Sequence, residues 1–439
     1  MKSNTKSIEK ILIITLGCSK NLVESEQLIT QLKSNGIEVS YNKELSDEKT
    51  VIINTCGFIN DAKKESIDTI LFYADAKNKG IIDNLIVFGC LTQLYKDELK
   101  KLITEIDEIF GTNNINQIIE YLHFKYNKDF SDKRFITTPS HYAYLKISDG
   151  CNRKCTFCAI PTIKGKYKSV PIEKLISEAE YLAANGVKEL ILVGQDTSVY
   201  GIDIYGKNTL ASLLEKLSRI KNIEWIRLHY TYPVDFPDEI LSIIKNNDKI
   251  CKYLDIPFQH ISNSVLRKMK RGITKSDTLK LIEKIRKKLP NITLRTTLIT
   301  GFPDETDKDF NELYDFVKET KFDRLGVFIY SHEEFTYAYT HHTDNIPMKV
   351  KKQRYNSIMK LQKNISFEKN LQKINSIINV IVDYREGDFF ICRSQGDSPE
   401  VDNEVLVKYA DYLTVGSIIP VEIYNCDHYD LFGKAIKKP

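Results

Sequence analysis

The sequence predicts an α/β protein in three parts: an amino-terminal doubly wound parallel sheet, a central partial (β/α)6 barrel and a small carboxy-terminal β-barrel. Buried strands alternate with helix-length stretches in the first part, six more strands alternate with helices in the second, and short β-rich runs follow from about residue 370. The chain has 439 residues, 42% of them hydrophobic, which is ample for about three cores. We expect the domains to span residues 8–125, 135–369 and 370–438.

The composition argues for a cytoplasmic protein. Lys plus Arg number 63 and Asp plus Glu 59, so the net charge of +4 does not by itself indicate nucleic acid. No run of 18 uninterrupted apolar residues occurs, and the amino terminus has no secretory pattern, so we expect no membrane partner. In a reducing cytosol, the nine cysteines are expected to be metal ligands or reactive thiols rather than disulfides.

In the first part, three predicted strands each end on a Cys beside a Gly. Helical stretches from Leu22 to Ser34 and from Asp61 to Asp75 separate the strands, so the sheet should be parallel and its carboxyl ends should share one edge. The strands are Ile11 to Leu16, Val51 to Thr55 and Leu85 to Phe88, and the cysteines are Cys18, Cys56 and Cys90. Any one could be a buried apolar residue. Three together, without a fourth ligand, favour an iron–sulfur cluster with one exchangeable iron over structural zinc.

The second part begins with the spacing C-x3-C-x2-C, formed by Cys151, Cys155 and Cys158, with Phe157 directly before the last Cys. Three thiolates can hold a 4Fe-4S cluster and leave its fourth iron open. A zinc ribbon would pair C-x2-C with a second C-x2-C, which the sequence lacks.

This spacing, on a loop after the expected strand from Tyr142 to Ile147, resembles the radical S-adenosylmethionine (SAM) superfamily. The resemblance implies that the open iron held by Cys151, Cys155 and Cys158 binds SAM, and that an electron from the cluster releases a 5'-deoxyadenosyl radical.

Five further strands are expected to complete the partial barrel: Glu189 to Val193, Ile223 to Leu228, Lys252 to Ile256, Ile292 to Ile299 and Leu325 to Ile329. Polar or aromatic residues follow them: Gln195, Asp196, His229, Tyr230, Gln259, His260 and Tyr330. Residues at the carboxyl ends of barrel strands form sites, although any single one could be a solvated loop residue.

The third part is predicted to be a five-stranded barrel with strands in Ile377 to Val382, Phe389 to Cys392, Glu404 to Lys408 and Ile418 to Tyr424. Residues 370–439 hold seven basic and eleven acidic residues, which disfavours binding a phosphate backbone. We expect Asp397, Glu400, Asp402 and Glu404 to present a negative face to a basic protein. Cys251, Cys392 and Cys426 have no partner spacing and are expected to be structural.

The whole chain resembles the methylthiotransferase family. Three stretches carry the resemblance and match the branch that modifies a ribosomal protein aspartate: 16–26, 195–203 and 253–260. The tRNA-modifying branch typically has Gln-Met-Asn after the first Cys and Gln-Asn-Val where this chain has Gln195-Asp196-Thr197. The tail resembles the TRAM module through Arg393-Ser394 and 399–402, with Cys392 where that module usually has Gly.

The resemblance implies insertion of a methylthio group at the β-carbon of an aspartate in the twelfth protein of the small ribosomal subunit. It implies two 4Fe-4S clusters, one on Cys151, Cys155 and Cys158 and one on Cys18, Cys56 and Cys90, with SAM as methyl donor and radical source. A reductant and a sulfur donor would be partners, and no catalytic residue is expected beyond the cluster ligands. Two alternatives stay open: a tRNA adenosine methylthiotransferase, although no tRNA partner is expected, and a non-catalytic metal-bearing module on the ribosome.

Overall fold

The computed structural model describes residues 10–436, which divide into two compact units. The first unit takes in residues 10–138, 144–152 and 159–182, and the second takes in residues 139–143, 153–158 and 183–436. The outer ends of the predicted domains, residues 8–9 and 437–438, lie outside the described residues, and the three domain ranges stay predictions. Between residues 10 and 436, no helix is both long and apolar enough to cross a bilayer.

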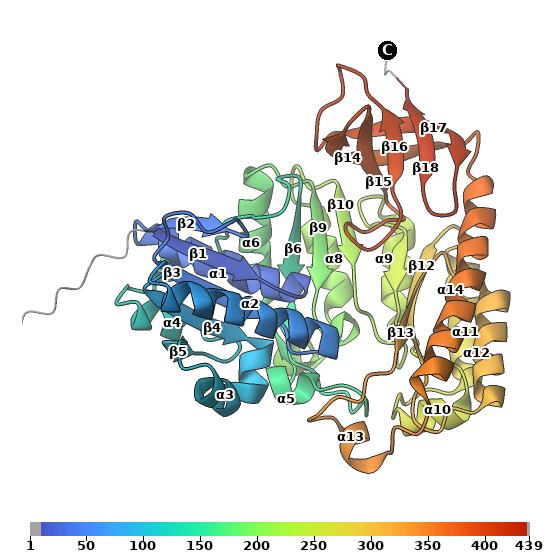
Figure 1. The fold of residues 1–439 in the computed structure, drawn as a ribbon. Helices are drawn as coiled ribbons and strands as arrows, with labels where there is room; N and C mark the ends of the chain where they lie inside the picture. The colour runs from blue at the N-terminus through green and yellow to red at the C-terminus, as the bar shows by residue number, and fades with distance from the viewer. Residues whose placement is uncertain (1–9, 437–439) are drawn as a thin grey trace, which may run out of the picture. The chain divides into compact units, whose positions relative to one another are not determined.

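The first unit contains a five-stranded parallel sheet with the strand order β2-β1-β3-β4-β5 (Figure 1). Its strands are β1 (Lys10–Thr15), β2 (Glu38–Tyr41), β3 (Thr50–Thr55), β4 (Asn84–Gly89) and β5 (Glu108–Ile109). The helices between and after them are α1 (Ser19–Ser34), α2 (Asn60–Asn78), α3 (Cys90–Leu102) and α4 (Ile115–Tyr121), followed by the 3-10 turn η1 (Lys128–Phe130).

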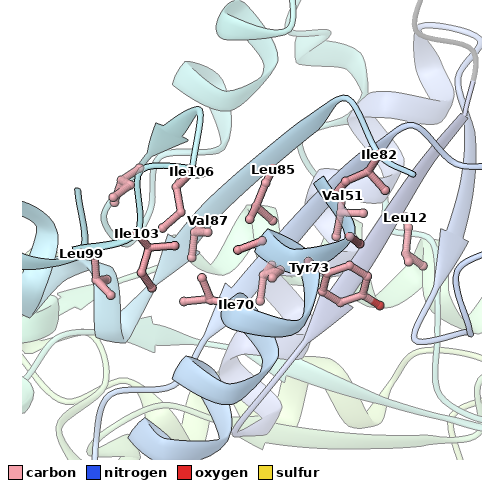
Figure 2. Close-up of a cluster of buried hydrophobic side chains, with 14 of the residues drawn as sticks. Leu12, Val51, Ile70, Tyr73, Ile82, Leu85, Val87, Leu99, Ile103 and Ile106 are labelled. Carbon is pink, nitrogen blue, oxygen red and sulfur yellow. The ribbon is translucent and has the colours of Figure 1, made fainter. Parts of the chain in front are cut away.

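Successive residues of each strand point to opposite faces of this sheet, so both faces carry apolar side chains, and helices cover both. Figure 2 shows one core, in which Leu12, Val51 and Val87 meet Ile70 and Tyr73 of α2. The intervening strand residues form a second core with α1 and α4 that includes Ile11, Ile13, Ile52, Ile86, Leu28, Ile29, Ile118 and Ile119. The predicted doubly wound parallel sheet is confirmed.

The central strands form two three-stranded sheets, β10-β9-β6 and β11-β12-β13, and a parallel bridge between Ile226 and Ile250 links β10 to the segment that leads into β11. The strands are β6 (Tyr142–Lys146), β9 (Glu189–Val193), β10 (Trp225–Leu228), β11 (Tyr253–Asp255), β12 (Thr293–Thr300) and β13 (Arg324–Ile329). The partial six-stranded barrel is therefore confirmed. A small antiparallel pair, β7 (Ser148–Asp149) and β8 (Lys168–Ser169), lies in the first unit.

Helices alternate with the barrel strands. They are α5 (Ile160–Lys164), α6 (Ile172–Ala184), α7 (Ile202–Tyr205), α8 (Leu210–Ser218), α9 (Asp238–Asn246), α10 (Asn263–Lys268), α11 (Lys275–Lys288), α12 (Asp307–Thr320), α13 (Tyr337–His341) and α14 (Met348–Leu371), with the 3-10 turn η2 (Thr197–Val199). Two of them start where the sequence specifies it: Thr274 and Asp277 form a capping box at α11, and Thr306 and Asp309 form one at α12.

The tail is a closed five-stranded barrel in the order β14-β15-β16-β18-β17, as predicted (Figure 1). Its strands are β14 (Ile377–Glu386), β15 (Phe389–Ser394), β16 (Val405–Lys408), β17 (Ile418–Cys426) and β18 (Leu431–Ala435). Cys392 lies in its core, and Cys251 is buried in the second unit, where burial raises the pKa of its thiol to about 12. Both behave as structural residues.

The acidic loop between β15 and β16, residues 395–404, differs from its prediction. Asp397 is only 1% exposed and accepts a 2.9 Å bond from Nε of Arg324. Asp402 lies 3.3 Å from Nε of Arg295 and accepts a bond from the Tyr253 hydroxyl. The expected negative face is wrong for these two carboxylates, because buried barrel arginines need counter-charges and the loop supplies them.

A second charge network joins the tail to the barrel within the same unit. Glu189 accepts a hydrogen bond from Nε of Arg227 at 2.8 Å, and its other carboxylate oxygen forms an ion pair with Nη1 of Arg393, also at 2.8 Å. Burial raises the pKa of Glu189, but the two arginines outweigh it and the net shift is downward. Arg393 also pairs with Asp383, which in turn accepts from His141 at 2.7 Å. The carboxylates of this interface are therefore held ionised.

Candidate metal centres

The three amino-terminal cysteines follow three adjacent strands of the first sheet. Cys18 is the N-cap of α1 shortly after β1, Cys56 directly follows β3, and Cys90 is the first residue of α3 directly after β4. Since β1, β3 and β4 are parallel neighbours, all three cysteines lie at one edge, as the sequence predicts.

Glycines allow the three strand ends to approach closely. Gly17 has a φ of +91°, and a Cβ there would lie 2.7 Å from Cys56 Cβ and 2.9 Å from Cys56 Sγ. A Cβ at Gly57 would lie 2.7 Å from the backbone nitrogen of Leu91, the residue after Cys90. A side chain at either position would fill the space between neighbouring cysteine loops.

Asn21 ties these ends together from α1. Its Nδ2 donates to the carbonyls of Leu16 and Thr55, at 2.9 and 3.1 Å, and its Oδ1 lies 3.7 Å from Cys90 Sγ. Ser66 of α2 brackets Cys56 by accepting from its N–H and donating to its carbonyl, both at 3.0 Å. Buried polar contacts therefore hold the backbone around these cysteines in place.

Burial favours the neutral thiol at two of these cysteines, Cys56 and Cys90. Burial raises the pKa of Cys56, and burial raises that of Cys90 further, although Lys164 acts to lower it. A metal would have to displace these protons on binding. Cys90 is the first residue of α3, where the helix dipole would favour a thiolate formed in this way.

The central triplet occupies one loop between β7 and α5. At its start, the Cys151 N–H donates to the Gly165 carbonyl at 3.1 Å, within the first unit. The part from Arg153 to Cys158 is anchored in the second unit, where Thr156 donates to the Met269 carbonyl and accepts from Ala338 N–H. Both ends of the loop therefore have fixed backbone partners.

Cys155 has two polar neighbours. Nη1 of Arg271 donates to its Sγ at 3.2 Å, and the Tyr232 hydroxyl lies 3.6 Å from the same sulfur. The Arg271 and Arg153 guanidiniums lie 4.2 and 4.1 Å from the centroid of the Tyr232 ring. Two guanidinium groups and a tyrosine hydroxyl therefore surround the Cys155 sulfur.

The donor chemistry fits iron–sulfur clusters at both places. Each triplet offers three thiols and, among residues 10–436, no His, Cys, Asp or Glu set converges at metal-ligand distances as the side chains stand, so the assignment rests on donor type and backbone approach. Near Cys155, Arg271 also donates to the Pro257 carbonyl. Within the described chain, Oε1 of Gln259 and Oγ1 of Thr300 find no hydrogen-bond partner, which suits the binding of a polar cofactor.

The predicted carboxyl-end residues divide into two groups. Asp196 accepts from Nε of Arg153 at 2.8 Å, which ties it to the cysteine loop, and Gln259 and Tyr230 have φ values of +71° and +56°. Backbone conformations of this kind cluster at functional sites. The ring of His229 contacts Ser398 of the tail loop at 2.9 Å, and its place in a site stays a prediction.

Sequence reasoning missed Asn21, Tyr232 and Arg271. None directly follows a strand, and each reaches a cysteine distant in sequence; Arg271 is 116 positions from Cys155. No spacing signal marks such contacts.

Three family models match the chain. The radical SAM superfamily covers residues 145–317, the uncharacterized protein family UPF0004 covers 10–111, and the TRAM domain covers 374–436. Each match lies within one of the three predicted parts, in the same order.

Solved structures share the fold at low sequence identity. The radical SAM methyltransferase TsrM from Kitasatospora setae, solved with cobalamin and a [4Fe-4S] cluster, has a TM-score of 0.54 and 12% identity over 93% of this chain and 84% of that chain. The cobalamin-dependent SAM radical enzyme OxsB has a TM-score of 0.52 and 14% identity over 81% of this chain and 56% of that one.

Curated relatives are far more similar. Proteins named ribosomal protein uS12 methylthiotransferase RimO are 48% identical in Cytophaga hutchinsonii, over 100% of both chains, and 48% in Flavobacterium johnsoniae, over 98% of this chain and 99% of that one. The relative in Bacteroides fragilis is 46% identical over 97% of this chain and 98% of its own. At this identity over nearly the whole length, the chain belongs to the RimO family of radical SAM methylthiotransferases.

Proposed function

We propose that this chain replaces one hydrogen on the β-carbon of an aspartate in ribosomal protein uS12 with a methylthio group, which gives 3-methylthioaspartate. The full-length similarity to relatives named for this activity carries the proposal. The stretches 16–26, 195–203 and 253–260, which distinguish the ribosomal from the tRNA branch, support the same substrate.

The proposal includes two 4Fe-4S clusters. Cys151, Cys155 and Cys158 would hold one, together with SAM, and Cys18, Cys56 and Cys90 would hold the other. Three thiols at one sheet edge, packed against glycines, support the second cluster. When bound, the clusters and SAM would supply the electron, the carbon radical and the methylated sulfur.

The chain's own residues would place these groups. Arg271 and Tyr232 hold the Cys155 sulfur through their polar contacts, and Arg153 is held by Asp196. Asn21 and Ser66 fix the backbones around the amino-terminal cysteines. The protein would thus orient its cofactors with buried polar side chains and leave the bond-breaking chemistry to them.

An external reductant and a sulfur donor belong to the proposal, because the reaction consumes electrons and one sulfur atom for each product. A cytoplasmic location is also part of it, since the substrate is a component of the ribosome.

Mass spectrometry of uS12 and of tRNA, from cells with and without the gene, tests the substrate. We expect the mass increment of one methylthio group on a uS12 aspartate only when the gene is present, with tRNA unchanged. Gene-dependent methylthiolation of tRNA adenosine with unmodified uS12 would replace the proposal by its alternative.

A further inference from the structure

A buried charge network lies beside Cys90 in the first unit. Nζ of Lys164, at the end of α5, lies 2.5 Å from Oε1 of Glu24 in α1, and both side chains are 2% exposed. The same carboxylate oxygen lies 3.1 Å from Nζ of Lys146. Asp149 completes the network, at 3.4 Å from Lys146 and 3.9 Å from Lys164.

This network reaches the cysteine edge at two places. Cys90 packs against Ile163, the residue directly before Lys164, and Glu24 is on the same helix that Cys18 caps. Gly165, the residue directly after Lys164, accepts the Cys151 N–H. Lys164 is therefore placed between a contact of Cys90 and a backbone partner of Cys151.

Burying the Lys164–Glu24 pair, with Lys146 and Asp149 largely shielded beside it, costs free energy that the packing of apolar side chains would not cost. Apolar residues of similar volume commonly replace buried ion pairs without loss of stability. The ionised state is nevertheless held here: burial lowers the pKa of Lys164, but Glu24 and Asp149 outweigh it and the net shift is upward. A permanently charged ammonium next to a cysteine site has a direct electrostatic consequence, because the potential of an iron–sulfur cluster depends on nearby charge.

We propose that Lys164 is a positioning residue for the cluster site of Cys18, Cys56 and Cys90: held by Glu24, it keeps a positive charge beside Cys90 and raises the reduction potential of the cluster bound there. This inference rests on the proposed function, which assigns a cluster to these cysteines. Glu24 acts in the opposite sense, because its negative charge partly cancels that of Lys164.

The test uses the full chain in which Cys151, Cys155 and Cys158 are changed to Ala, so that the amino-terminal cluster is the one measured. Dithionite supplies one electron to the cluster, with no bond formed or broken, and electron paramagnetic resonance follows the reduced form to give a midpoint potential. Lys164→Met removes the positive charge, Glu24→Gln removes the negative one, and Lys166→Met removes an exposed charge two residues away as the matched control.

We expect Lys164→Met to lower the equilibrium constant for one-electron reduction at least tenfold, which is 59 mV toward more negative potential. Glu24→Gln should shift the potential in the positive direction, and Lys166→Met should leave it unchanged because water screens an exposed charge. Lys164→Arg, which keeps the charge, should restore most of the wild-type potential.

Opposite shifts of the midpoint potential in Lys164→Met and Glu24→Gln would indicate an electrostatic role. Damage to packing alone would not make the sign of the shift follow the sign of the charge removed. Unshifted potentials, or shifts of the same sign, would overturn the inference while leaving the proposed function intact. If Lys164→Met does not fold, Glu24→Gln decides alone, and the absence of a positive shift overturns the inference. A parent protein that binds no cluster would instead overturn the two-cluster proposal itself.

Discussion

Gly17 shows how a single residue can decide whether two cysteines meet. Its φ of +91° lies in the left-handed region, and a methyl group there would lie 2.9 Å from Cys56 Sγ. Gly36, at the end of α1, has a similar φ of +81° but nothing within 4 Å of its own Cβ position. Both glycines therefore adopt a left-handed backbone conformation, but of the two only Gly17 lies so close to another residue that a side chain would overlap with it.

This pair gives a matched test. Gly36→Ala should cost about 1–2 kcal/mol of unfolding free energy, because the left-handed conformation is unfavourable for Ala. Gly17→Ala should cost about 1–3 kcal/mol more through overlap with Cys56, and should lower the iron content of the amino-terminal cluster. Urea unfolding and iron analysis check both variants, and equal effects at the two positions would contradict the close approach.

At the scale of elements, the loop between β15 and β16 holds the tail barrel to the central barrel. Asp397 pairs with Arg324 at the first position of β13, and Asp402 pairs with Arg295 of β12. The tail is therefore bound to the barrel through ion pairs within one unit. Two of the loop's negative charges are paired in this contact and are not available to a binding partner.

Arg324→Leu should lower the unfolding free energy by about 3–5 kcal/mol, because it removes the hydrogen-bonded counter-charge of the buried Asp397 and leaves only the Lys373 charge nearby. The double variant Arg324→Leu and Asp397→Leu should recover most of that loss. Arg219→Leu, which breaks an exposed pair with Glu215, should cost no more than about 1 kcal/mol. Equal losses of unfolding free energy for Arg324→Leu and Arg219→Leu, measured by urea unfolding, would contradict a stabilising role for the ion pair between Arg324 and Asp397.

The same loop predicts a pH dependence. Burial raises the pKa of Asp397, but Arg324 and Lys373 outweigh it and the net shift is below the ordinary value. A depressed folded-state pKa gives stability that is fully present above about pH 4 and is lost as the pH falls through the folded value. In Asp397→Asn, the decline of stability as the pH falls below about 4 should be shallower, as followed by urea unfolding. An unchanged slope of unfolding free energy against pH would show that protonation of Asp397 does not cause the loss of stability.

The elements could be predicted from sequence where the signal is local. Strand, helix and cysteine spacing gave the doubly wound sheet, six barrel strands and the tail barrel, because periodicity and capping residues act within a few positions. Glu24 and Lys164 are 140 positions apart, so their pairing depends on tertiary structure. The prediction for the acidic loop fails for the same reason, because the sequence shows its charges but not Arg324 and Arg295, which pair with them in the folded chain.

At the scale of the whole molecule, the chain has three parts: the amino-terminal sheet with Cys18, Cys56 and Cys90, the central barrel and the tail barrel. Family models match each part, and the curated relatives match nearly the whole chain. The central claim is that the two cysteine triplets do different work, one generating the radical and the other handling the methylated sulfur. Different work predicts that the activities can be separated by mutation.

The most direct measurement compares wild-type protein with the Cys18→Ala, Cys56→Ala, Cys90→Ala variant, both reconstituted with iron and sulfide and given SAM, a reductant and uS12. Chromatography quantifies 5'-deoxyadenosine, and mass spectrometry quantifies methylthiolated uS12 in the same reaction. We predict that the variant still forms 5'-deoxyadenosine but no methylthiolated product. A folded variant that retains the Cys151, Cys155 and Cys158 cluster yet forms neither compound, or one that still forms the product, would contradict separate roles.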